Sequence, residues 1–99
     1  MVVDDEITTL EIVKSCLKKE DFEVVTVDSN RKAFEIMENE KENNFSLILI
    51  DTRFPNSNIP AFFSMNPKSK KNIDTSIEDN FLKKPFTKEE LLEFIKKRI

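Results

Sequence analysis

The sequence predicts an α/β domain: a doubly wound, parallel, five-stranded sheet with helices on both faces, in three layers, lacking the third helix. Three observations predict this fold. Short apolar segments alternate with amphipathic segments of helical spacing, which is the order expected of a parallel sheet covered by helices. Residues 45–50 are apolar at nearly every position, as in a strand buried on both faces. The 99 residues suit one domain, 1–99.

The first half of the chain predicts two strands, each followed by a helix. Residues 1–3 form a short apolar strand, and residues 6–19 carry apolar side chains near helical spacing. Residues 22–27 are rich in β-branched side chains, which predicts the second strand. Asp28 or Ser29 is in position to cap the next helix. The inner face of that helix is expected to consist of Ala33, Phe34, Ile36 and Met37.

The second half predicts three strands and a final helix. Residues 45–50 are expected to form the central strand and residues 59–65 the fourth, with Pro60 near its start, where a missing donor is tolerated. The polar segment 66–80 has room for one short helix, and residues 80–86 predict a short fifth strand.

The final helix has a clear start. Thr87 and Glu90 have the spacing of a capping box, in which each side chain binds the backbone N–H of the other residue. The inner face of this helix is expected to consist of Leu91, Leu92, Phe94, Ile95 and Ile99.

Composition excludes several classes of function. The net charge of -3, with lysines and glutamates interspersed, gives no basic field for direct nucleic-acid binding. No apolar run approaches the roughly 20 residues of a membrane span, and no signal segment is recognised, so we expect a cytoplasmic protein without membrane contact. With one cysteine, Cys16, and no histidine, any metal site must use oxygen ligands.

Charged side chains collect where three predicted strands end. Asp4 and Asp5 follow the first strand, Asp51 ends the third and Lys84 ends the fifth, so all should lie at the carboxyl edge of a parallel sheet. Three carboxylates repel one another unless a cation separates them, and Mg²⁺ suits such ligands. An aspartate beside a metal and an ammonium group can act as a nucleophile toward phosphorus. Each residue alone also has a plain structural interpretation as a helix-start, turn or surface charge.

Three segments carry a resemblance to a known family. "VVDDE", "LILIDTRFP" and "FLKKPF" resemble, in the same order, the signature segments of the response-regulator receiver domain of two-component signalling. The resemblance covers nearly the whole chain. It implies a five-stranded flavodoxin-like fold, phosphorylation by a histidine kinase or phosphotransfer protein, and dependence on Mg²⁺.

The resemblance also implies roles for single residues. Asp51 matches the phosphoacceptor. Asp5 would ligate Mg²⁺ directly, Asp4 through coordinated water, and Arg53 through its main-chain carbonyl. Lys84 would pair with Asp51 and then with the incoming phosphoryl group.

The second half of the chain departs from the family pattern. Met65 falls where the family has a Ser or Thr hydroxyl, and Ser64 lies one residue earlier. Because neighbouring strand residues face opposite ways, Ser64 serves only if a bulge or register change re-aims it. Phe81 matches the family's switch aromatic, or is a plain core aromatic.

The connection after Asp51 is short. Asp51 and Lys84 are 33 residues apart (84 − 51), whereas the family that the chain resembles usually needs roughly fifty to fit two helices and a strand there. The third helix is therefore expected to be absent, either naturally or by internal deletion. Its absence would leave a sheet face with side chains such as Phe62 or Phe63 exposed, which a second copy or another protein would cover.

Three classes of function follow. The first is a stand-alone phosphorylation-controlled signalling module that accepts a phosphoryl group at Asp51 and signals to a downstream protein partner. The second is a degenerate receiver that acts as a phosphorylation-independent interaction scaffold. The third, an enzyme acting on small molecules, is disfavoured because no pocket-forming insertion or glycine-rich loop is seen.

Overall fold

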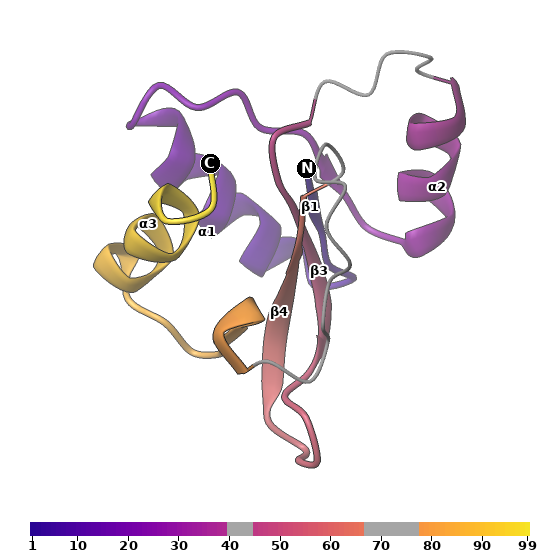
Figure 1. Cartoon of the computed structure of the whole chain (residues 1–99). Coiled ribbons are helices and arrows are strands. Elements are labelled where there is room, and N and C mark those ends of the chain that lie inside the picture. The colour runs from indigo at the N-terminus through magenta and orange to yellow at the C-terminus, as the bar shows by residue number, and fades with distance from the viewer. Residues whose placement is uncertain (40–44, 67–77) are drawn as a thin grey trace.

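The strands form one open sheet in the order β2-β1-β3-β4-β5, of which Figure 1 labels β1, β3 and β4. The computed structural model describes residues 1–39, 45–66 and 78–99. The strands are β1 (Val2–Val3), β2 (Thr26–Val27), β3 (Ile48–Arg53), β4 (Pro60–Met65) and β5 (Phe81–Lys83). The five strands and their alternation with helices confirm the predicted α/β class.

Helices lie on both sides of this sheet. They are α1 (Ile7–Lys18), α2 (Asn30–Asn39) and α3 (Lys88–Lys96), with a 3-10 turn, η1 (Glu78–Asn80). α1 and α3 cover one face and α2 lies on the other (Figure 1). In the described ranges none of these helices has the length and apolar character that a membrane span requires.

The connection between β3 and β4 is a hairpin turn, residues 54–59, without a helix. The predicted absence of the third helix is thus confirmed. The expectation that every strand is parallel is wrong for β4, which pairs with β3 in antiparallel register. The physical reason is length, because a parallel neighbour needs a crossover of about a dozen residues or more.

Of the five strands, only β4 differs in direction from the predicted parallel sheet. β1 pairs in parallel with both β2 and β3. β5 is antiparallel to β4, so β5 runs in the same direction as β3. Four strands therefore keep the direction that the sequence predicted, and their carboxyl ends share one edge.

The hairpin also lengthens β3. We predicted a strand over residues 45–50 that ends at Asp51, but β3 continues to Arg53 because β4 supplies partners beyond Asp51. The turn is closed by the Phe54 N–H, which donates to the Ile59 carbonyl at 2.8 Å. Asn56 takes the left-handed conformation (φ 58°), which asparagine tolerates better than most residues.

Two apolar cores hold the layers together. The core beneath α1 and α3 includes Val13, Leu49, Phe62 and Leu91. The core beneath α2 consists of Met1, Val3, Val27, Ala33 and Ile48. β1 and β3 supply both cores because successive side chains of a strand alternate between faces.

Four predicted positions differ in burial. Phe62 is fully buried rather than exposed, since it lies on the face that α1 and α3 cover. Phe63 is half-buried on the other face, and a partner there remains a prediction. Phe34 is exposed on the flank of α2, and Ile99 is exposed beyond the end of α3.

Helix starts follow the predicted capping signals. The Lys32 N–H donates to Ser29 Oγ at 3.2 Å, so Ser29, and not Asp28, caps α2. Thr87 and Glu90 form the capping box of α3, with both bonds at 3.1 Å.

Phe62→Ala should lower the free energy of unfolding by about 3–5 kcal/mol, because it leaves a cavity in a fully buried position. The control Phe34→Ala removes the same ring from a side chain that is 62% exposed and should change stability by at most about 0.5 kcal/mol. Chemical denaturation followed by circular dichroism measures both. Equal losses in the two variants would contradict the described core.

Candidate functional site

Three strands bring charged side chains to one edge of the sheet. Asp4 directly follows β1, Asp51 lies within β3 and Lys84 directly follows β5. These strands run in the same direction, so the three residues meet although Lys84 lies 80 positions after Asp4. They line a cleft of about 680 Å³.

Lys84 bridges two aspartates. Its Nζ donates to Asp4 Oδ2 at 2.6 Å and to Asp51 Oδ1 at 2.7 Å. Nζ also lies 4.2 Å from the centre of the Phe62 ring. Burial alone would lower the pKa of Lys84, but hydrogen bonds and charge attraction from Asp4 and Asp51 outweigh burial and raise this pKa above its usual value.

The bridging lysine is also held by its backbone. The Lys84 N–H donates to the Pro60 carbonyl at 2.8 Å, which fixes the end of β5 to the first residue of β4. Its side chain is only 16% exposed. The ammonium group is therefore positioned from both ends.

Asp4 and Asp5, which are adjacent in the sequence, differ in environment. The Asp4 side chain is 1% exposed, and its Oδ1 accepts the Glu6 N–H at 2.9 Å. This bond satisfies a donor at the start of α1, whose N-cap side chain does not do so. Asp5 is exposed, and within the described ranges its carboxylate has no hydrogen-bond or ion-pair partner.

The acidic cluster fits a divalent cation of the magnesium type. One carboxylate oxygen from each of Asp4, Asp5 and Asp51 can be chosen so that all lie within 4.8 Å of one another. Lys84 supplies one positive charge against three negative ones, so the cluster keeps a charge of −2 (1 − 3). Oxygen ligands and excess negative charge are what Mg²⁺ prefers.

Of the predicted site residues Arg53 and Phe81, only Arg53 lines the cleft. Arg53 borders the cleft, while its side chain turns away and donates to the Asn58 carbonyl at 3.2 Å. Phe81 is half-buried, with its ring 5.2 Å from that of Phe63 and 6.0 Å from that of Phe54. Its role as a switch remains a prediction.

Ser64 lies away from the site, so the expectation that it supplies a hydroxyl there is wrong. Because β4 is reversed, Ser64 pairs with Leu49 rather than reaching the carboxyl edge. Its hydroxyl donates to the Asn80 carbonyl at 3.2 Å and accepts from Arg98 Nε at 3.1 Å. Met65 lies one residue further from the site.

Pro60 borders the cleft instead, and our reading of the sequence missed it. It is the first residue of β4 and brings a carbonyl, not a hydroxyl, beside Lys84. The short connection after Asp51 was the signal that could have identified it, because that length permits only a hairpin.

The fold and the edge site together define a class. They are those of a doubly wound α/β domain, a class that binds its ligands at the carboxyl ends of its strands. A model of the response regulator receiver domain matches residues 1–65. The chain belongs to this receiver domain family, whose members are phosphoacceptors of two-component signalling. Comparison with curated proteins and with solved structures finds no match.

Lys84→Met should lower the free energy of unfolding by about 3 kcal/mol, because it leaves the buried Asp4 carboxylate without its counter-charge. The matched control is Lys83→Met, which removes an exposed ammonium one residue earlier and should cost less than about 1 kcal/mol. Urea denaturation at neutral pH measures both. If Lys84→Met is as stable as the control, the bridge does not stabilise the fold.

Mg²⁺ should stabilise the folded protein by about 1.4 kcal/mol at ten times its dissociation constant, as linkage requires of a ligand that binds only the native state. Asp5→Asn should abolish most of this gain, since it removes the exposed ligand. Asp21→Asn, which changes an exposed aspartate outside the cluster, should leave it intact. Thermal unfolding with and without Mg²⁺ measures this stabilisation in each variant. Equal stabilisation of both variants by Mg²⁺ would exclude the cluster as the binding site.

Proposed function

We propose that this chain is a phosphoacceptor module, which takes a phosphoryl group at Asp51 from the phosphohistidine of a histidine kinase or phosphotransfer protein. The observation that carries the proposal is the Lys84 ammonium, which bridges Asp51 and the buried Asp4 at hydrogen-bond distance. The family match supports the same reaction class.

The geometry supplies a nucleophile and a charge partner. Asp51 Oδ1 accepts from Lys84, which leaves Oδ2 to attack phosphorus. The new P–O bond forms as the P–N bond of the donor breaks, and the imidazole nitrogen keeps the electron pair and takes up a proton. Lys84 Nζ then pairs with a phosphoryl oxygen, because an ammonium group on a flexible stem can follow the new charge.

Asp4, Asp5 and Asp51, with the main-chain carbonyl of Arg53, are the residues that would hold Mg²⁺. When bound there, Mg²⁺ would supply positive charge against the phosphoryl oxygens. The protein's own contribution is positional: Asp51 lies inside a paired strand, and Asp4 is buried. Both carboxylates are therefore held in place before the donor binds.

We place this module in the cytoplasm and assign it no turnover of small molecules beyond self-phosphorylation and self-dephosphorylation. Its signal would pass to a protein partner through contacts, without direct binding to nucleic acid. The Ile12 side chain on α1 is exposed and lines the cleft, which supports docking of a protein rather than a small substrate.

The second candidate is a degenerate receiver that acts as a scaffold without phosphorylation. It is favoured by the reversal of β4, which brings Pro60 to the cleft and takes Ser64 away from it. Without the Ser64 hydroxyl, one hydrogen bond to the phosphoryl group is lost, and a weakened readout is expected even if transfer occurs.

Incubation with Mg²⁺ and acetyl phosphate should give one phosphoryl adduct, detected by intact mass spectrometry, that is absent from Asp51→Asn. Asp28→Asn is the matched control, because Asp28 also follows a strand of the sheet, β2, but is exposed outside the cluster. It should be phosphorylated like the unchanged protein. No adduct on a folded protein that binds Mg²⁺ would favour the scaffold instead.

A further inference from the structure

An aromatic ring lies beneath the ammonium group of Lys84. Lys84 Nζ lies over the face of the Phe62 ring, 4.2 Å from its centre, and the Phe62 side chain is fully buried. Phe62 pairs directly with Asp51 across the β3–β4 hairpin. The antiparallel register of β4 therefore places a ring, and not a hydroxyl, opposite Asp51.

A second ring packs against the first. The Phe86 ring lies 5.9 Å from the Phe62 ring, at an interplanar angle of 43°. Phe86 lines the cleft and also packs against the core beneath α1 and α3. Because buried side chains are close-packed, a ring enclosed by this core and by Phe86 has little freedom to turn its face away from Nζ.

Three contacts of Nζ within the described part of the chain respond differently to phosphoryl transfer. Asp51 Oδ1 accepts from Nζ as a carboxylate oxygen, but after transfer to Oδ2 it belongs to a neutral acyl group, which is a weaker acceptor. Asp4 accepts from Nζ and is also a candidate ligand of a cation, which would compete with the ammonium group for its charge. Neither event changes the ring contact, because an aromatic face attracts a cation through its fixed quadrupole.

We propose that Phe62 is a positioning residue for phosphoryl transfer, whose ring keeps the Lys84 ammonium beside Asp51 before, during and after the step. This inference rests on the proposed function. Nζ can then exchange its bond to the Asp51 carboxylate for a bond to a phosphoryl oxygen without leaving the ring. A charge that is in place before the reaction need not be reorganised during it, which is how preorganised groups accelerate a reaction.

The contact itself is tested by nuclear magnetic resonance on the metal-free protein, without phosphorylation. The methylene protons next to Lys84 Nζ should resonate upfield of those in exposed lysines, because an aromatic ring shields protons above its face, and Phe62→Leu should abolish this shift. Lys83 is the internal control, since its Nζ lies 4.2 Å from the centre of the Phe54 ring and its own upfield shift should persist in Phe62→Leu. A Lys84 shift that is absent from the unchanged protein, or that survives in Phe62→Leu, would overturn the inference.

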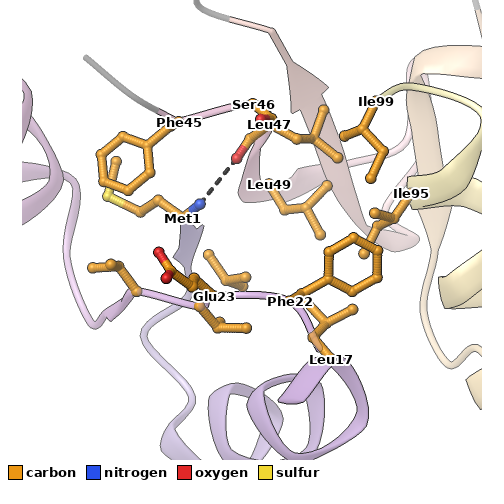
Figure 2. Close-up of a pocket in the computed structure, with 13 residues that line it drawn as sticks. Met1, Leu17, Phe22, Glu23, Phe45, Ser46, Leu47, Leu49, Ile95 and Ile99 are labelled. Carbon is orange, nitrogen blue, oxygen red and sulfur yellow. Dashed lines mark hydrogen bonds between the residues drawn. The ribbon is translucent and has the colours of Figure 1, made fainter. Parts of the chain in front are cut away.

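The role in transfer is tested by replacing Phe62 with phenylalanines that carry one, two or three ring fluorines. Fluorine withdraws charge from the ring face and weakens its attraction for a cation stepwise, while the side chain nearly keeps its shape. The rate of phosphorylation by acetyl phosphate with Mg²⁺ should fall with each fluorine, by about fivefold at three, as expected for loss of a cation–π contact. The matched control is the same series at Phe22, whose ring packs against the same core and borders a cavity at the other edge of the sheet (Figure 2). Fluorination there should leave the rate unchanged.

The outcomes separate the positioning role of Phe62 from the proposed function. An adduct that forms at the same rate throughout the series at Phe62 would overturn the positioning role and leave Asp51 as the phosphoacceptor. Equal slowing by fluorination at Phe22 would assign the effect to core packing and also overturn that role. No adduct on the folded, unchanged protein would contradict the proposed function, and the positioning role with it.

Discussion

The length of the connection after Asp51 determines how the second half of this molecule is built. Only eight residues separate Asp51 from Pro60 (60 − 51 − 1), too few for a helix that crosses the sheet and returns in parallel. The chain turns back at once, and β4 runs antiparallel to β3. Pro60 therefore reaches the carboxyl edge of the sheet, and Ser64 lies away from it.

The cluster of charged side chains still forms although β4 is reversed, because the second reversal, from β4 to β5, restores the original strand direction. β4 is antiparallel to β3, and β5 is antiparallel to β4, so β5 ends at the edge where β1 ends. Lys84 reaches Asp4 and Asp51 as it would in an all-parallel sheet. The positions of Asp4, Asp51 and Lys84 therefore do not depend on the direction of the strand that carries the hydroxyl in the family pattern. Nucleophile, lysine and cation ligands come together without that hydroxyl.

The parts of the fold that depend on local signals were predictable. The apolar run before Asp51, the capping box at Thr87 and the charged residues after two short strands each identified an element or a site residue. The direction of β4 could not be predicted from its own residues, because an apolar strand has the same pattern in either direction. Its direction depends on the connecting segment, and we used that segment only to remove a helix. The exposure of Phe62 was predicted wrongly for the same reason, because its burial depends on which face of the hairpin packs against α1.

The direction of β4 is open to a direct measurement by nuclear Overhauser spectroscopy on the uniformly labelled protein. The reversed strand predicts close contacts between α-protons of alternate opposed residues of β3 and β4, in the register that pairs Asp51 with Phe62 and Leu49 with Ser64. Contacts that instead place Ser64 beside Asp51, without α-proton pairs between the two strands, would contradict the hairpin and restore a parallel sheet.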